Sequence, residues 1–325
     1  MPTSAKWLLL GLAAAVLGLA APQAEAQRLS ERPITLIVPF TAGTGPDALA
    51  RVLGEELRQR WDQPVVVENR PGASGNIGTA QAARATPDGH TLMVSVNTFV
   101  MNPSLFKSIP YDPQKSFEPI AEIATGAMGL VVHSSVEAKT VKEFVALAKS
   151  KPGVLDYASP GRGTPHHLAM ELFKQTAGID LKHVPYTGSA GAVKDIVGGH
   201  VKTGFLPIHV ALPLVADKHI RLLAIGSEQR SPLAPDVPTL AEEGVAGFDV
   251  DLWYGVMAPA GTPKDIIERY NKVINEILAT PKVRDALAAQ GLVARGGPPA
   301  RLAELIARDQ PRWAKVVKEA AITAE

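Results

Sequence analysis

Short apolar runs alternate with helix-like segments along most of this 325-residue chain, and this alternation limits the possible folds more than any other feature. The strand-like runs cover residues 34–40, 64–68, 91–95, 129–133, 154–158, 182–184, 203–206, 221–226 and 251–257. The helix-like segments cover residues 47–61, 76–85, 140–150, 165–177, 189–197, 208–216, 263–279 and 300–319. Strands that alternate with helices are typical of α/β proteins with parallel sheets. We therefore predict an α/β fold whose sheets are mostly parallel and flanked by helices.

Three strand-to-helix transitions pass through a turn rich in Gly, Ser and Thr. The segments read ITLIVPFTAGTGPDALAR (34–51), LDYASPGRGTPHHLAMELF (155–173) and VPYTGSAGAVKDIVGG (184–199). The start of a helix carries unpaired N–H groups and the positive end of the helix dipole. Small residues let an anion approach those groups closely. The three turns together predict an anion site built largely from the backbone.

The chain shows no linker or low-complexity tract that would separate two domains, so we expect the chain to pass between lobes more than once. We predict that residues 27–123 plus 250–325 form lobe 1 and that residues 124–249 form lobe 2. Ligands of open α/β sheets bind beyond the carboxyl ends of strands, where all three turns lie. One turn falls in lobe 1 and two fall in lobe 2, so we expect them to face each other across a cleft.

The N-terminus has the pattern of a secretory signal peptide. Lys6 precedes an unbroken apolar stretch at residues 7–21, and an AEA sequence follows at residues 24–26. The apolar stretch is shorter than the ~20 residues that a membrane-spanning helix needs. We predict that residues 1–26 are removed after Ala26, that Gln27 begins the mature chain, and that the protein lies in the periplasm.

Composition excludes several classes of function. The formal net charge is +1, aromatic residues make up 5% of the chain, and no basic cluster is interleaved with them, so nucleic-acid binding is not expected. The chain has no Cys, so its stability must come from its core without disulfides.

Catalytic, metal and nucleotide motifs are weak. The chain has no G-x-S-x-G elbow, and Ser159 and His167 are close only in sequence. Neighbouring His166 and His167 would point about 100° apart on a helix, which suits a shared metal poorly. The GTG at residues 43–45 lacks the third glycine of a dinucleotide site, and no P-loop is present. We expect no metal, no cofactor and no catalytic residue.

Several motifs occur together in an order that resembles one known family. They include VPFTAGTGPDALAR, VVVENRPGASGNIGT, TPDGHTLM, YASPGRGTPHHLAMELF, HVPYTGSAGAVKDIVGGHV and DLWYGVMAPAGTPKDI. In these motifs the chain resembles the periplasmic receptors of tripartite tricarboxylate transporters, often called the Bug family, over nearly its whole mature length. The resemblance implies a two-lobed periplasmic-binding-protein (Venus-flytrap) fold in which loops of both lobes hold one carboxylate.

The resemblance also implies a set of ligand-binding residues. In lobe 1 the set is Phe40, Thr41, Ala42, Gly43, Thr44 and Asp47, with Asn97 and Thr98 reaching the far end of the ligand. In lobe 2 it is Ser159, Gly161, Gly163, Thr164 and His167, with Tyr186, Thr187 and Gly188 closing the wall. Asp47 is equally suited to cap a helix, and His167 and Tyr186 are equally suited to packing roles.

Three residues depart from the family's usual pattern. Thr44 follows Gly43 where a second glycine is usual, Lys202 stands where an acidic residue is common, and Leu206 stands where a polar residue is frequent. These departures bear on the identity of the ligand, which the motifs do not define.

The sequence therefore favours a non-enzymatic periplasmic receptor that binds a small carboxylate: a di- or tricarboxylate, an acidic amino acid or an aromatic acid. Its expected partners are the membrane permease subunits of a tripartite tricarboxylate transporter, and it is expected to be a monomer. Two alternatives remain open. The receptor could present its ligand to a sensor kinase, or the protein could be a secreted hydrolase that uses Ser159 with His167.

Overall fold

The computed structural model describes residue 29 and residues 31–323. The predicted signal peptide, residues 1–26, lies outside the described residues. No described helix combines the length and the apolar character that crossing a bilayer would require.

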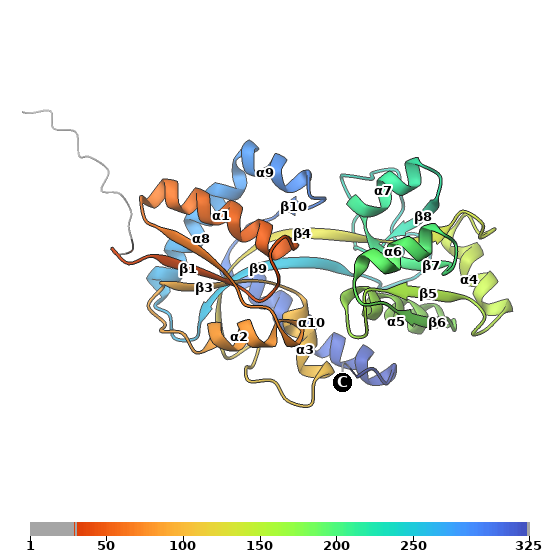
Figure 1. The fold of residues 1–325 in the computed structure, drawn as a ribbon, viewed down its shortest axis with the longest axis horizontal. Coiled ribbons are helices and arrows are strands. Elements are labelled where there is room, and N and C mark those ends of the chain that lie inside the picture. The colour runs from red at the N-terminus through yellow and green to blue at the C-terminus, as the bar shows by residue number, and fades with distance from the viewer. Residues whose placement is uncertain (1–28, 30, 324–325) are drawn as a thin grey trace, which may run out of the picture.

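The chain forms two halves joined by two long strands (Figure 1). The first half begins with β1 (Ile34–Val38), α1 (Gly45–Trp61), β2 (Val65–Asn69), η1 (Ala73–Gly75), α2 (Asn76–Ala83), β3 (Thr91–Val96) and α3 (Thr98–Leu105). The strand β4 (Phe117–His133) then crosses to the second half. That half contains α4 (Val141–Ser150), β5 (Asp156–Ser159), α5 (Pro165–Ala177), β6 (Lys182–Pro185), α6 (Ser189–Val197), β7 (Thr203–Pro207), α7 (Ile208–Ala216) and β8 (Ile220–Ile225). The strand β9 (Asp251–Pro259) returns to the first half, which ends with α8 (Lys264–Ala279), α9 (Pro281–Ala288), β10 (Val293–Ala294) and α10 (Pro299–Glu319).

Each half combines a set of parallel strands with antiparallel pairs to the two long strands β4 and β9. In the first half β2, β1 and β3 pair in parallel, and in the second half β6, β5 and β7 pair in parallel. Strands β4 and β9 are antiparallel to each other, and β4 also pairs antiparallel with β7, β8 and β10. Strand β4 crosses the predicted boundary between residues 123 and 124, so this one strand belongs to the sheets of both halves.

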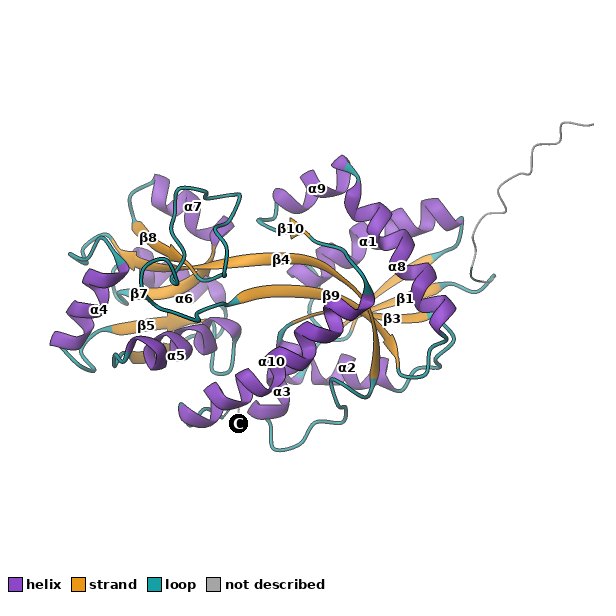
Figure 2. Cartoon of the chain, turned by 180° about the vertical axis from the view of Figure 1, so that it is seen from behind, coloured by secondary structure: helices purple, strands orange, loops and turns teal. Residues whose placement is uncertain are grey.

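One helix packs against both halves. Helix α10 crosses β4, packs against α3 and extends to α5 of the second half, as Figure 2 shows. The indole N–H of Trp253 donates to the carboxylate of Asp309 on α10 at 2.7 Å, and Gln175 on α5 donates to the carbonyl oxygen of Val316 at 3.3 Å. Trp313 and Phe173 belong to one continuous buried cluster, so the core extends from one half into the other.

The predicted α/β alternation is confirmed, and most differences concern single elements. The predicted bounds of α5, α6 and α7 agree with the structure, whereas α1 starts two residues earlier than predicted. The structure adds helices α3 and α9, strand β10 and residues 117–128 of β4, which the sequence pattern does not predict. Strand β10 has only two residues and α3 contains Pro103, so neither carries a clear periodic pattern.

Candidate functional site

The turn between β1 and α1 is closed by Thr44. The N–H and Oγ1–H groups of Thr44 both donate to the carbonyl oxygen of Thr41, at 3.4 and 2.8 Å. The carbonyl oxygen of Thr44 accepts the N–H of Ala48 at 3.0 Å, which makes Thr44 the N-cap of α1. Gly43 adopts a φ of +83°, a conformation that glycine reaches without strain. The hydroxyl of Thr44 therefore stabilises the turn itself.

Asp47 braces the same turn from the first helical turn of α1. Its Oδ2 accepts the N–H of Gly43 at 2.8 Å and Nε of Arg51 at 3.0 Å, while its Oδ1 accepts Nδ2 of Asn69 at 2.9 Å. Oδ1 also lies 3.0 Å from Nη2 of Arg51, and the side chain is buried. Burial alone would raise the pKa of Asp47, but the hydrogen bonds from Arg51, Gly43 and Asn69 outweigh it and hold the pKa below its usual value. Both carboxylate oxygens are thus occupied within the protein.

The turn between β5 and α5 is closed by Thr164. Its N–H and Oγ1–H groups donate to the carbonyl oxygen of Gly161, at 3.4 and 2.8 Å. Its carbonyl oxygen accepts the N–H of Leu168 at 3.0 Å, and its Oγ1 accepts the N–H of His167 at 3.4 Å. Gly163 adopts a φ of +72°, and its N–H donates to Nδ1 of His167 at 3.0 Å.

The first and second turns share one hydrogen-bonding scheme. The equivalent positions are Gly43 and Gly163, Thr44 and Thr164, and Asp47 and His167. In both turns the threonine closes a four-residue turn and caps the helix, and a side chain four residues beyond the glycine accepts the glycine N–H. The acceptor is an anion with Arg51 beside it in the first turn and a neutral imidazole in the second.

This scheme leaves other N–H groups of the turns unpaired. In the described part of the chain, the N–H groups of Ala42 and Gly45 in the first turn and of Arg162 and His166 in the second donate no recorded hydrogen bond. Ala42 and Arg162 are exposed, and the remaining groups lie at the starts of α1 and α5. Unpaired N–H groups at two helix starts form a suitable environment for an anion.

A stack of three rings supports the second turn. The rings of His167 and His183 lie 3.9 Å apart between centroids, and Tyr157 stacks on His183 at 4.8 Å. Burial, followed by the positive charges of Arg162 and Lys174, lowers the pKa of His167 to about 4. Burial and the neighbouring His167 lower the pKa of His183 to about 3. Both rings are neutral at pH 7, so His167 can offer Nδ1 as an acceptor.

The hydroxyl of Ser159 is held within the turn and has no free position for catalysis. It donates to the carbonyl oxygen of Gly161 at 3.0 Å and accepts the N–H of Gly161 at 3.2 Å. It also lies within hydrogen-bond distance of Nε2 of His183, at 2.7 Å. Ser159 is fully buried, and Nδ1 of His167 is occupied by Gly163. Among the residues that the structure describes, no recorded hydrogen bond joins Ser159 to His167 or His167 to a carboxylate, both of which the hydrolase alternative requires.

The third turn is joined to the second by two backbone hydrogen bonds. The N–H of Tyr186 donates to the carbonyl oxygen of Ser159 at 3.0 Å, and the N–H of Gly188 donates to that of Pro160 at 3.0 Å. Thr187 between them is exposed. The predicted residues of the second half therefore lie together in one connected surface.

The hydroxyl of Tyr186, in the turn before α6, is bound to a side chain of that helix. It donates to Oδ2 of Asp195 at 2.6 Å. A Cβ atom on Gly191 would lie 3.0 Å from the Tyr186 ring, so this glycine leaves room for the ring. The tyrosine has a packing role, and its phenol is already paired.

Asn97 and Thr98 follow β3, whose carboxyl end lies beside that of β1 because the two strands are parallel neighbours. The N–H of Asn97 donates to the carbonyl oxygen of Trp253 at 3.2 Å, and its Nδ2 donates to that of Asp251 at 2.9 Å. The Oδ1 of Asn97 and the Oγ1 of Thr98 are buried and have no recorded partner among the described residues. These two residues are not joined to the three turns by any recorded hydrogen bond.

Phe40 packs against the segment that precedes α2 and so supports the first turn. Its ring is half-buried and would lie 3.3 Å from a Cβ atom on Gly75, and its carbonyl oxygen accepts Nδ2 of Asn69 at 3.1 Å. Across the junction of the halves, a Cβ atom on Gly163 would lie 3.0 Å from Cδ1 of Leu105, so the second turn touches α3.

Two of the departures from the family pattern have clear surroundings. Thr44 occupies the position that Thr164 occupies in the second turn, and both hydroxyls donate to a carbonyl oxygen of their own turn. Nζ of Lys202 donates to the carbonyl oxygen of Gly199 at 2.7 Å, so the lysine closes the turn after α6.

Arg162 is a residue of the site region that the sequence analysis missed. It lies in the second turn between two glycines, it is exposed, and it makes no recorded ion pair within the described part of the chain. Its charge lowers the pKa values of His167 and His183. The sequence GRGT could have pointed to Arg162, because a cation among glycines that are expected to bind an anion adds positive potential to the site.

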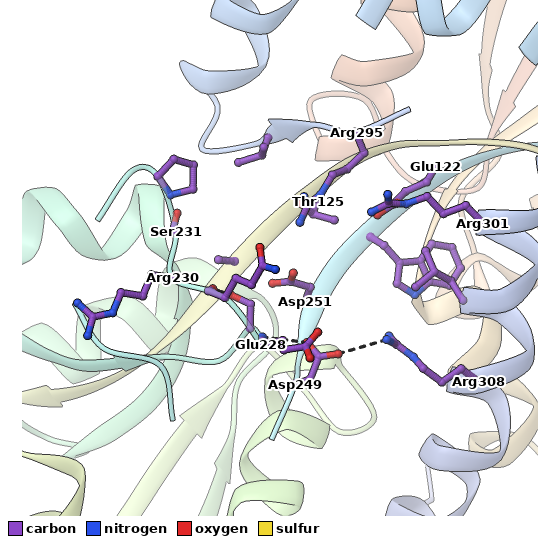
Figure 3. A pocket seen from close by; sticks show the side chains of 17 residues that line it. Glu122, Thr125, Glu228, Arg230, Ser231, Asp249, Asp251, Arg295, Arg301 and Arg308 are labelled. Atoms are coloured by element: carbon purple, nitrogen blue, oxygen red, sulfur yellow. Dashed lines mark hydrogen bonds and ion pairs between the residues drawn. The ribbon is translucent and has the colours of Figure 1, made fainter. Parts of the chain in front are cut away.

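A separate cavity of about 320 Å³ lies where β4, β9, α10 and the 227–232 loop meet (Figure 3). Arg308 pairs with Asp249 there at 3.3 Å, and Arg301 pairs with Glu122. The Oδ1 of Asp251 is buried without a recorded partner, and burial together with the charge of Asp249 raises the pKa of Asp251 to about 7. None of the predicted site residues lines this cavity.

Among the residues that the structure describes, no three His, Asp or Glu side chains gather in a way that could hold a metal ion. The chemistry available at the three turns is that of N–H donors, threonine and serine hydroxyl groups, neutral histidines and one exposed guanidinium. The hydroxyls of Thr44, Ser159 and Thr164 are already paired within the turns. This chemistry suits binding of an anion without covalent change.

The comparisons with known proteins point in the same direction. A family model described as "Tripartite tricarboxylate transporter family receptor" matches residues 49–322. Protein BugT of Bordetella pertussis is 37% identical over 312 residues, which cover 95% of this chain and 95% of BugT.

Two solved structures are similar over most of the chain. The R. palustris protein Rpa4515, solved with adipate, has a TM-score of 0.77 and 33% identity, and the match covers 90% of this chain and 98% of that one. MatC from Rhodopseudomonas palustris, solved with bound malate, has a TM-score of 0.73 and 31% identity, covering 88% and 99%.

Proposed function

The chain belongs to the tripartite tricarboxylate transporter receptor family, and we propose that it binds a small carboxylate between its two halves and delivers it to the membrane subunits of such a transporter. The family is one of periplasmic solute-binding receptors and not of enzymes, as the sequence analysis expected. The proposal includes the predicted export to the periplasm with cleavage after Ala26, and the predicted lobes 27–123 plus 250–325 and 124–249.

The observation that carries the proposal is the shared scheme of the first two turns. Two helix starts, one in each half, are stabilised by internal hydrogen bonds and retain unpaired N–H groups at Ala42, Gly45, Arg162 and His166. A carboxylate between them would gain hydrogen bonds from both halves at once, which favours a closed arrangement of the halves.

Each predicted site residue receives a role in this proposal. Ala42 and Thr187 are proposed to face the carboxylate with their backbone N–H groups. Gly161 and Gly188 are proposed to shape the second and third turns, because their N–H groups already donate to Ser159 and Pro160. Gly43, Thr44, Asp47, Ser159, Gly163, Thr164 and His167 are proposed to shape the turns, because their polar groups are paired within them. Thr41 is proposed to shape the first turn through its carbonyl oxygen, which accepts from Thr44. Phe40, Tyr186, Asn97 and Thr98 are proposed to form the walls. Relatives with adipate and malate support a carboxylate as the ligand.

Ala42→Glu and Ala42→Gln test the proposal as a matched pair. Ala42 is exposed, so neither change disturbs the core. A carboxylate at residue 42 would repel a bound carboxylate and lower its affinity by about tenfold or more, whereas the amide would not. Thermal shift with a panel of small carboxylates first identifies a ligand, since a ligand at 100 times its Kd adds about 2.7 kcal/mol of apparent stability.

The thermal-shift panel tests whether the protein binds a carboxylate, and the Ala42 variants test whether the ligand lies at the first turn. No shift with any carboxylate would contradict the carboxylate receptor. A shift of equal size in the wild type and in Ala42→Glu would place the ligand elsewhere and contradict the first-turn site.

A further inference from the structure

A second cavity opens in the second half, next to the second and third turns. It has a volume of about 200 Å³ and lies at the carboxyl ends of β5 and β7, between the first turns of α5, α6 and α7. Pro160 and Ser189 line it, and each is the immediate neighbour of a proposed site residue. A ligand whose carboxylate is held at these turns would therefore have the cavity beside it.

The walls of this cavity are apolar. Ala192, Phe205 and Leu206 are each less than 5% exposed, and Val193 from α6 completes the same wall. None of the described residues that line the cavity is Lys, Arg, Asp or Glu. The departure at Leu206 thus lies in the wall, where its side chain adds apolar surface.

The polar side chains of the cavity are the imidazoles of His166 and His209 and, at its exposed rim, the hydroxyl of Ser189. Burial lowers the pKa of His166 to about 4, and burial also lowers that of His209, so both rings are neutral at pH 7. Nδ1 of His166 is buried and has no recorded partner among the described residues. This atom offers one hydrogen bond to an uncharged polar group.

We infer that the ligand is a monocarboxylate with an apolar body, aliphatic or aromatic, whose body lies in the cavity bounded by Leu206, Val193 and His166. The inference rests on the proposed carboxylate site. A second carboxylate in the cavity would lose its water without meeting a cation, and an unpaired buried charge is strongly unfavourable. A hydroxyl group at the same place would meet Nδ1 of His166. The volume suits the body of a small acid, since drug-sized ligands occupy larger pockets of about 300–1,000 Å³.

Three acids of equal chain length test the inference: hexanoate, 6-hydroxyhexanoate and adipate. Titration calorimetry on the purified protein is expected to give Kd values for hexanoate and 6-hydroxyhexanoate that are about tenfold or more below that of adipate. Adipate binding as tightly as hexanoate, or binding of di- and tricarboxylates alone, would overturn the inference and leave the proposed function in place. Absence of binding by every carboxylate would overturn the proposed function as well.

Variants on α6 locate the body of the ligand. Val193→Phe fills the cavity and is expected to weaken hexanoate binding by about tenfold or more. Val197→Phe, one turn further along the same helix and outside the cavity, is the matched control and should bind hexanoate as the wild type does. Equal affinities of the two variants would overturn the placement.

A third variant locates the far end of the ligand by charge, so its result does not depend on filling the cavity. Ser189 is exposed at the rim of the cavity, so Ser189→Lys adds a cation without disturbing the core. The change should raise the affinity for adipate relative to hexanoate by about tenfold, because the second carboxylate would then have a partner. An unchanged ratio of the two Kd values would contradict the proposal that the far end of the ligand lies beside Ser189.

Discussion

Nδ1 of His167 accepts a hydrogen bond from the N–H of Gly163 at 3.0 Å, in the same way that Asp47 accepts the N–H of Gly43 at 2.8 Å. The acceptor of the second turn has no charge of its own at pH 7, and the charge of the first is countered by Arg51. The two turns can therefore approach one anion without presenting an uncompensated negative charge to it.

This relationship predicts opposite results for two changes at His167. Asn keeps an acceptor of the length that already works at residue 47, so His167→Asn should fold with a loss of about 1 kcal/mol from the ring stack. His167→Asp should lose more stability, because its buried carboxylate would lack the partner that Arg51 provides to Asp47. His167→Asn should retain carboxylate binding, while His167→Asp should lose about tenfold or more. Equal affinities for both variants, measured by calorimetry, would argue that the second turn lies away from the ligand.

Arg162 is expected to contribute attraction that depends on salt. Because the side chain is exposed, Arg162→Ala should weaken carboxylate binding by roughly two- to tenfold at low ionic strength, and the difference should shrink at about 0.5 M salt. Lys149→Ala on α4 removes the same charge from an exposed position outside the turns and serves as the control. A salt-independent loss for Arg162→Ala would instead indicate a direct, buried contact.

Ser159→Ala is predicted to lower the stability of the protein by loosening the second turn, and no catalytic activity is expected in either the wild type or the variant. The hydroxyl makes hydrogen bonds with both backbone groups of Gly161 and with His183, so its loss should cost about 1–3 kcal/mol in the free energy of unfolding. Denaturant titration measures the loss. Turnover of a model ester by the wild type that disappears in Ser159→Ala would revive the hydrolase alternative.

Acid should destabilise the protein through its buried histidines. Burial lowers the pKa of His166 to about 4, below the ordinary value near 6.5, so the unfolded chain binds more protons between these values and stability falls as pH drops from about 6.5 towards 4. His166→Phe removes one such group. Its Tm should match that of the wild type near pH 7 and exceed it near about pH 4.5. Parallel Tm curves for the two proteins would contradict a neutral, buried His166.

Asp251 should act in the opposite direction. Its pKa is raised to about 7 by burial and by Asp249, with Glu122 acting in the same direction and Arg295 and Ser227 against it. The folded state therefore holds the proton longer than the unfolded chain, and stability falls as pH rises from about 4 to 7. Asp251→Asn should stabilise the protein by roughly 1–3 kcal/mol near pH 8 and have little effect near pH 4. Denaturant titration at the two pH values measures the difference, and a destabilised variant at pH 8 would mean that the carboxylate is paired.

The absence of a linker predicts that the chain passes between the halves more than once. Which segments make the crossing depends on how the strands pair, and this the sequence does not show. Strand β4 was predicted only at 129–133, whereas it runs from Phe117 and pairs along one length with β9 and along the next with β7 and β8. A strand that changes partners has no single burial pattern, so period-two alternation does not reveal it.

At the site, too, some features follow from local sequence spacing and others depend on the tertiary fold. The glycine-rich turns and the Asp47–Arg51 pair follow from local spacing, and the structure contains that pair at 3.0 Å. The partner of Ser159 does not follow from spacing. It is His183 on β6, which the parallel pairing of β5 and β6 brings beside it.

The sequence by itself determined the α/β alternation, the three turns and the family, because each depends on residues close together in the chain. The tertiary structure decided that Asp47 and His167 support their turns with paired polar atoms. It also decided that Leu206, Val193 and His166 line one cavity. Burial and hydrogen-bond partners arise from contacts between distant segments, and only the folded chain brings those segments together.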